Sequence, residues 1–146
     1  MEYKFRAWDK DNEHMAYSDK HESDYDFYFY GKSGNLVCAV NCCYCDKFGD
    51  EHDDWQELDN IMPYTGVNDK YGKEIYDGDI VKFDVYKYEK LVSSIISDIK
   101  WCEELCSFSV VVNNQGVRGT LGHFLHSNKE VEVIGNIYEN AELLDH

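Results

Sequence analysis

Six cysteines are the residues of this chain whose type and spacing could do chemistry most directly. Cys42 and Cys45 have two residues between them, and Cys102 and Cys106 have three. Four thiolates spaced in this way can hold a tetrahedral zinc ion if two distant hairpins bring the pairs together. The first pair lacks the glycine that is typical of a zinc knuckle. Reduced, partly buried thiols are the simpler interpretation, and the zinc site stays open as a prediction.

Carboxylates around one glycine offer a second kind of chemistry. Asp77 and Asp79 flank Gly78, and together with Asp84 or Glu74 they could gather around Mg²⁺. Ordinary turn chemistry explains the same pattern, because an Asp side chain beside Gly bonds to the nearby backbone. We therefore expect a turn at this position and keep the metal-dependent enzyme as the alternative.

Other ligand types are scattered along the chain. His52-Asp53-Asp54 and the pair His123 and His126 have ligating side chains, yet such residues in polar loops are usually just solvated. The sequence contains no nucleophile elbow, phosphate-binding glycine loop or zinc-protease helix motif. It thus favours a protein without catalytic activity and without a cofactor.

The elements that must position these residues are strands and tight turns. The segment 62–81 reads Met-Pro-Tyr-Thr-Gly-Val-Asn-Asp-Lys-Tyr-Gly-Lys-Glu-Ile-Tyr-Asp-Gly-Asp-Ile-Val, with turn residues and strand residues in a fixed order. Gly66 and Gly72 can adopt the positive φ of tight turns, which predicts a hairpin. After the Asp-Gly-Asp turn, Val81, Phe83 and Val85 alternate with polar residues, which predicts a strand with one apolar face.

This segment resembles the signature of the YopX family of bacteriophage and prophage proteins. The resemblance continues in Tyr-Lys-Phe-Arg-Ala-Trp-Asp-Lys at 3–10 and in Val-Ile-Gly-Asn-Ile-Tyr-Glu-Asn-Ala-Glu-Leu-Leu at 133–144. It covers nearly the whole chain, although the middle parts match only in residue type. It implies an SH3-type β-barrel and a phage setting, but no particular activity, because none is established for the family.

The fold class that we predict is mainly β, with little helix: a small β-rich N-terminal region over residues 1–60, followed by the SH3-type barrel over residues 61–146. The high content of Tyr, Phe and Trp suits half-buried sheet surfaces. We expect one short helix, over 120–126, and a helical turn in the acidic segment 48–59. Strands are predicted over 3–8, 14–17, 24–30, 36–41, 94–101, 108–112 and 131–138.

Charge limits the kinds of partner. The chain has 29 acidic against 14 basic residues, a net charge of −15, and residues 1–60 alone have 15 against 6. A surface of this sign repels the phosphate backbone, so direct nucleic-acid binding is not expected. Solubility explains the charge most simply. The sharper hypothesis is an acidic face that engages a host or phage protein with a basic surface.

Aromatic residues raise the question of self-association. Trp8, Trp55 and Trp101 are predicted to be core residues, although an exposed recognition surface is the alternative. In the run Tyr25–Tyr30 both faces of the predicted strand are rich in aromatic residues. Such a strand favours a homo-oligomer or a second packed layer.

No apolar run is long enough to span a membrane, and no secretory signal is apparent at the N-terminus. We therefore expect a protein of the host cytoplasm that does not bind membranes. The functional prediction is a phage-encoded, non-enzymatic protein-binding module. A zinc- or magnesium-dependent module and a self-assembling structural protein are the alternatives.

Overall fold

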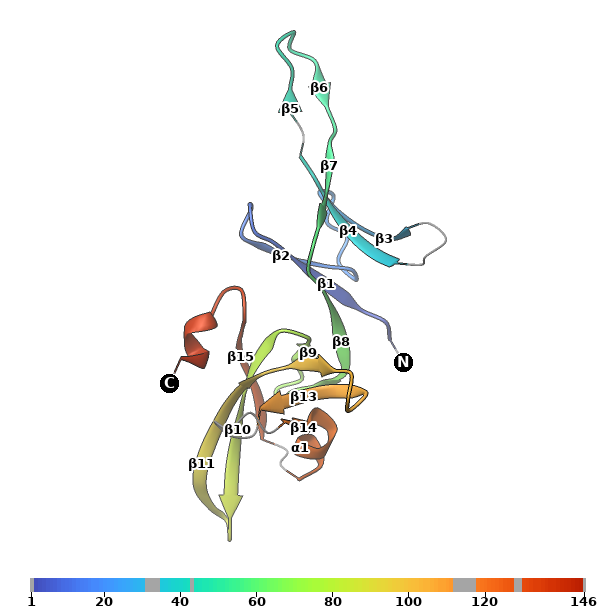
Figure 1. Ribbon diagram of the computed structural model, residues 1–146. Helices are drawn as coiled ribbons and strands as arrows, with labels where there is room; N and C mark the ends of the chain where they lie inside the picture. The colour runs from blue at the N-terminus through green and yellow to red at the C-terminus, as the bar shows by residue number, and fades with distance from the viewer. Residues whose placement is uncertain (1, 31–34, 43, 112–117, 128–129, 146) are drawn as a thin grey trace. The chain divides into compact units, whose positions relative to one another are not determined.

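The computed structural model describes residues 2–30, 35–42, 44–111, 118–127 and 130–145, and they are mainly strands (Figure 1). The chain divides into two compact units. We call Tyr3–Pro63 the N-terminal unit, and Tyr64–His146 together with Met1–Glu2 the C-terminal unit. The predicted mainly β fold class is confirmed. No helix in the described residues is both long and apolar enough to cross a membrane.

The first sheet of the N-terminal unit is built around β1 (Phe5–Asp9). It pairs with β2 (His14–Tyr17) in an antiparallel hairpin that places Ala7 opposite Ala16. On its other side, β1 pairs with the first residues of β8 (Ile61–Asn68), the strand that continues into the C-terminal unit. The predicted strand over 14–17 is confirmed, and the one over 3–8 begins two residues later than expected.

A second sheet has the order β3-β4-β7, formed by β3 (Tyr25–Tyr30), β4 (Asn35–Asn41) and β7 (Trp55–Leu58). A short hairpin of β5 (Tyr44–Cys45) and β6 (Glu51–His52) lies between β4 and β7 in the sequence. The helical turn expected in segment 48–59 is wrong. Trp55 and Leu58 belong to a strand that pairs with β4, and this pairing decides the backbone against the local helical spacing.

The core of the N-terminal unit is small and uses small residues. Ala7, Ala16 and Cys38 are fully buried. The side chains that cover them are larger and only partly buried: Tyr25, Phe27, Leu58 and Ile61. Because these residues come from both sheets and from β8, burial of their apolar surface holds the two sheets of the unit together.

The C-terminal unit begins with the predicted hairpin. The later residues of β8 pair with β9 (Glu74–Tyr76). In the loop between them Gly72 has φ 81°, and Asp69 Oδ1 accepts hydrogen bonds from the amides of Tyr71 at 2.8 Å and Lys73 at 2.9 Å. Asp69 Oδ2 accepts a further bond from the Val133 amide at 3.1 Å, so this side chain fixes the loop to a distant strand.

The central sheet of this unit has the order β11-β10-β15, formed by β10 (Asp79–Lys87), β11 (Lys90–Asp98) and β15 (Val131–Asn136). A second sheet consists of β12 (Lys100–Cys102), β13 (Ser107–Val111) and β14 (Arg118–Thr120). The strands form a curled half-barrel, and an SH3-type barrel in detail stays a prediction. Helix α1 (Leu121–Ser127) confirms the expected short helix, and a 3₁₀ turn η1 (Ala141–Leu144) follows β15.

The larger core belongs to the C-terminal unit. Val81 and Phe83 of β10 point into it, as the sequence alternation predicted, and Ile75 and Val133 join them from β9 and β15. The remaining buried members are Ile99, Val110, Leu121 and Val131. Phe124 of α1 lies with its ring 5.2 Å from that of Phe83, so the short helix covers one end of this core.

Candidate functional site

Asp9 is the buried centre of a polar cluster in the N-terminal unit. It ends β1 and is 1% exposed. Its Oδ1 accepts hydrogen bonds from the amides of Asp11 at 3.0 Å and Asn12 at 3.1 Å. Its Oδ2 accepts bonds from Asn12 Nδ2 at 2.7 Å and from the Tyr25 hydroxyl at 2.9 Å. One carboxylate thus shapes the β1–β2 turn and ties β3 to it.

The surroundings of Asp9 and Tyr25 set the protonation states of these two side chains. Burial opposes ionisation of Asp9, but the hydrogen bonds from Asn12, Tyr25 and the Asp11 amide outweigh it and lower the pKa of the carboxyl. Burial, and then the hydrogen bond and charge of Asp9, raise the pKa of the Tyr25 hydroxyl. Tyr25 is therefore a neutral donor and Asp9 a charged acceptor over the physiological range of pH.

A second polar pair lies beside the first. His14 Nε2 is 2.8 Å from Glu22 Oε1, and Glu22 Oε2 accepts a hydrogen bond of 3.4 Å from the Tyr17 amide. The His14 ring lies 5.1 Å from the Tyr25 ring, at an interplanar angle of 32°. The two pairs therefore form one continuous group of side chains on β1, β2, β3 and the connection between β2 and β3.

Backbone hydrogen bonds fix that connection at both ends. The Ser18 amide donates to the Phe5 carbonyl and the Phe5 amide donates to Ser18 Oγ, each at 2.9 Å. At the other end, the Asn41 amide of β4 donates to the Asp24 carbonyl at 2.8 Å. The side chains of the connection are thus presented from a backbone that is anchored to β1 and β4.

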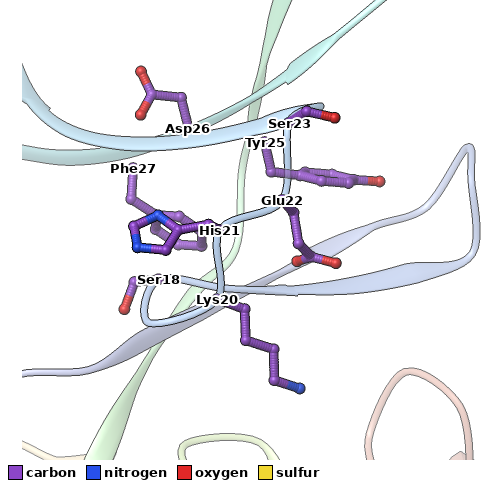
Figure 2. A pocket seen from close by; sticks show the side chains of 8 residues that line it. All are labelled: Ser18, Lys20, His21, Glu22, Ser23, Tyr25, Asp26 and Phe27. Atoms are coloured by element: carbon purple, nitrogen blue, oxygen red, sulfur yellow. The ribbon is translucent and has the colours of Figure 1, made fainter.

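Two adjoining pockets open over this connection, with volumes of about 970 and about 530 Å³. They share His21, Glu22, Ser23 and Tyr25. Figure 2 shows the smaller pocket: Glu22 and Tyr25 project to the same side of the connection, whereas the Lys20 ammonium points away from both. The larger pocket is lined by Asp11, Asn12, His14, His21, Glu22, Ser23, Asp24, Tyr25, Val40, Asn41 and Cys42.

The lining of the larger pocket suits a cation. It has the carboxylates of Asp11, Glu22 and Asp24 but no lysine or arginine. Carboxylates form strong charge-assisted hydrogen bonds with ammonium and guanidinium groups, and the face of a tyrosine ring attracts them. A cleft lined by one sign of charge also concentrates ions of the opposite sign. The arrangement can therefore bind a basic group without any step of bond breaking.

The cysteines predicted as zinc ligands fall into different units. Cys42 and Cys45 belong to the N-terminal unit, and Cys102 and Cys106 to the C-terminal unit. Across the described ranges, no group of three or more His, Cys, Asp or Glu side chains is arranged to hold a metal ion. The four-thiolate zinc site stays a prediction. Of the two spare thiols, Cys38 is buried in the N-terminal core, and Cys43 lies outside the described residues.

The Asp-Gly-Asp segment has the expected turn. Gly78 has φ 81°, and the buried Asp79 accepts a hydrogen bond from the Tyr76 amide at 2.8 Å through Oδ2. Of the two further carboxylates suggested for magnesium, Glu74 accepts a hydrogen bond from the Tyr76 hydroxyl at 2.8 Å. Asp84 accepts one from Ser94 and lies 3.5 Å from Lys82 Nζ. Asp79 thus has a structural role, and Asp84 already has a hydrogen-bond donor and a cation beside it.

The remaining predicted residues have structural surroundings. His52 Nε2 lies 2.8 Å from Asp46 Oδ2 across the β5–β6 hairpin. His123 contacts the Phe124 ring within α1. Trp55 and Trp101 are 45% and 50% exposed, so the prediction that they are core residues is wrong. Each lies on a short strand at the edge of its sheet.

Asp9, His14, Glu22 and Tyr25 were not identified from the sequence. Asp9 is followed by Lys-Asp-Asn, which predicted only a turn, and the hydrogen bond between Tyr25 and Asp9 spans sixteen residues. An Asp at a strand end before Asx residues is a local signal for a side chain that caps the turn. Its contact with β3 has no such signal, because it depends on how two sheets pack.

Comparison with known proteins gives the family. The model of the family described as "YopX protein" matches residues 4–145. No curated protein sequence matches the chain. The crystal structure of protein EF1440 from Enterococcus faecalis covers 99% of both chains at 23% identity, with a TM-score of 0.57. That of protein yopX from Bacillus subtilis covers 96% of both chains at 22% identity, with a TM-score of 0.60. These structures share the fold, and the family match shows that the chain belongs to the YopX family.

Proposed function

We propose that this chain is a non-enzymatic protein-binding module, encoded by a phage or prophage and acting in the cytoplasm of the host cell. Its partner is a host or phage protein with a basic surface. The N-terminal unit has 14 acidic residues against 6 basic ones, a net charge of −8. This charge attracts a basic protein and repels both nucleic acid and anionic membranes.

The larger pocket of the N-terminal unit is the main structural support for this function. Its three carboxylates and the Tyr25 ring line an open space of about 970 Å³. No lysine or arginine is among the lining residues. A lysine or arginine side chain of the partner would find hydrogen-bond acceptors of opposite charge there. The negative charge of the whole N-terminal unit would also attract the basic surface that surrounds this lysine or arginine on the partner.

Affinity capture with charge-matched variants tests the proposal. Asp11→Asn with Asp24→Asn removes two carboxylates from the pocket, and Asp54→Asn with Glu57→Gln removes two exposed ones that do not line it. Tagged wild-type protein should retain a basic host protein at physiological salt and release it at high salt, because screening weakens exposed charge contacts. The pocket variant should lose that protein, and the control variant should keep it.

Two results would contradict the proposal. If the wild type retains no specific basic protein, the negative charge serves solubility and not partner binding. Loss of the partner from both variants alike would show that total charge matters and the pocket does not.

Metal analysis separates this function from the zinc- or magnesium-dependent alternative. Stoichiometric zinc in the purified chain, released by Cys42→Ser and equally by Cys102→Ser, would support the four-thiolate site in place of the binding module.

A further inference from the structure

The hairpin of β10 and β11 extends as a two-stranded ribbon beyond the rest of its sheet (Figure 1). β15 pairs with β10 only over Asp79–Phe83. From Val85 to Val92, a segment that we call the β10–β11 arm, β10 and β11 pair only with each other among the described residues. Its turn residues Tyr88 and Glu89 have φ 50° and 61°, which are the left-handed values of a two-residue hairpin loop.

The arm exposes a group of large apolar side chains. Tyr86, Tyr88, Leu91 and Val92 are 50%, 89%, 56% and 61% exposed. The pairing passes from Val85 opposite Ser93 to Tyr86 opposite Leu91, so Val92 is the extra residue of a β-bulge. An exposed apolar group of this kind on a two-stranded ribbon indicates a protein contact surface.

The register shows which of these side chains share a face. Phe83 points into the core, so strand alternation places Lys82, Asp84 and Tyr86 on the opposite, outer face of β10. The Ser94 hydroxyl donates to Asp84 Oδ1 at 2.6 Å, which places Ser94 on the same face. Leu91 lies directly opposite Tyr86 and joins it there. Glu132 of β15 lies opposite Lys82 and forms an ion pair with Lys70, so the outer face combines an apolar pair with charges of both signs.

Charge favours a second copy of the chain as the occupant of this face. Two molecules of net charge −15 repel each other over most of their surfaces. On the outer face of the sheet, Lys82 and Asp84 lie 3.5 Å apart and Glu132 lies opposite Lys82. Lys87 and Lys90 are paired with each other on the other face of the arm. A face with both signs can complement itself about a two-fold axis, because each contact occurs twice with the partners exchanged. A basic partner gains little from this face, because Asp84 and Glu132 each already lie beside a lysine of the same chain.

We propose that two copies of this chain associate through the outer faces of their β10–β11 arms, with Tyr86 and Leu91 at the centre of the contact. This contact is independent of the acidic pocket, and it differs from the aromatic strand β3 as a route to a homo-oligomer. Salt should strengthen it, because screening weakens the repulsion between the two acidic molecules. The contact with a basic partner should respond to salt in the opposite direction.

Sedimentation equilibrium over a wide range of protein concentration tests the dimer. The mass of the wild type should rise from 17.1 kDa towards twice that value as the protein concentration increases. When salt is added, this rise should occur at a lower protein concentration. Tyr86→Ser with Leu91→Ser should raise the dimer dissociation constant by about tenfold or more, since central aromatic and aliphatic anchors carry most of the affinity of an interface. The control, Phe48→Ser with Trp55→Ser, removes apolar side chains that are 77% and 45% exposed elsewhere and should dimerise as the wild type does.

Circular dichroism of each variant checks that its sheets are intact. A wild-type chain that stays monomeric at all concentrations and salt levels would overturn the proposal. So would a folded arm variant that dimerises as strongly as the wild type, or a control variant that loses the dimer to the same extent as the arm variant.

Discussion

At the scale of single residues, the polar cluster around Asp9 sets how the N-terminal unit responds to acid. The folded-state pKa of Asp9 is lowered from the ordinary value of 3.8. A carboxyl of this kind contributes stability that is present above its unfolded-state pKa and is lost as pH falls through the folded value. The cluster therefore stabilises the unit at neutral pH and weakens it below about pH 4.

We predict that Asp9→Asn lowers the free energy of unfolding at neutral pH and flattens its dependence on pH in the acid range. The substitution removes a charged acceptor of four hydrogen bonds while keeping the size of the side chain. Urea unfolding of wild type and variant from pH 7 to about pH 3 measures both effects, because the titration of Asp9 falls in this interval. An unchanged acid slope in the variant would show that other carboxyls dominate.

Cys38 gives a second prediction at this scale. Burial, followed by the charges of Asp26, Asp9 and Glu22, raises the pKa of its thiol from 9.0 to about 12. Because the thiolate is the reactive form, Cys38 should resist alkylation by iodoacetamide at mildly alkaline pH, while the exposed Cys45 and Cys106 react. Mass spectrometry of tryptic peptides after timed labelling measures each rate.

The raised pKa also has a consequence for stability. The contribution of the neutral Cys38 thiol is fully present below the unfolded-state pKa of 9.0 and is lost as pH rises towards 12. Labelling of Cys38 as fast as that of Cys45 at a pH where the protein is folded would contradict its burial in the core.

At the scale of elements, the β8–β9 loop of the C-terminal unit depends on one side chain. Asp69 accepts hydrogen bonds from Tyr71, Lys73 and the distant Val133 amide. We predict that Asp69→Ala lowers the free energy of unfolding by about 1–3 kcal/mol, because it leaves the buried Val133 amide and two partly buried amides without this acceptor. Asp145→Ala, at an exposed position, should change it little. Chemical denaturation of the wild type and the two variants measures these differences. If Asp69→Ala is as stable as the wild type, Asp69 does not hold the loop in place.

The end of β15 depends on a close approach of two segments. A Cβ atom added at Gly135 would lie 2.5 Å from Asn140 Oδ1, the atom that accepts a hydrogen bond from the Asn136 amide. We predict that Gly135→Ala costs about 1–3 kcal/mol of stability through overpacking. Asn140→Gly removes the obstructing side chain, so the double variant should lose less than the sum of the two single losses. Strict additivity in thermal unfolding would rule out the clash.

At the scale of the whole molecule, net charge opposes the compact state. A chain with a net charge of −15 is destabilised by repulsion among its own carboxylates. Exposed ion pairs, such as Lys70 with Glu132 at 3.4 Å and Lys4 with Asp19 at 3.7 Å, contribute little to stability, because water and salt screen them. Salt screens both effects, and we expect the repulsion to outweigh these weak pairs.

We therefore predict that the melting temperature rises when sodium chloride is raised from low to physiological concentration. Differential scanning calorimetry at a fixed, low protein concentration measures this without a contribution from self-association. Glucose added in place of salt controls for non-ionic effects of the solute. A melting temperature that falls with salt would mean that the ion pairs outweigh the repulsion.

Most individual strands could be predicted from the sequence, since alternation of apolar residues and turn chemistry are local. The His14–Tyr17 strand, the apolar face of Val81 and Phe83, the turn at Gly78 and the helix near Leu121 are all in their expected places. The extended conformation at Trp55 was not predictable, because its spacing from Leu58 also fits a helix and only pairing with β4 excludes it.

The amino-acid sequence by itself determined the mainly β class, the resemblance to the YopX family and the acidic charge, because composition, alternation and turn residues act over a few positions of the chain. Only the tertiary structure brought Tyr25 onto Asp9 and His14 onto Glu22. Only it left Tyr86 and Leu91 exposed on an arm where, in the described part of the chain, β10 and β11 have no third strand beside them. Such contacts join residues that are far apart in the sequence. They follow from how the sheets pack and where pairing ends, and no local pattern specifies either.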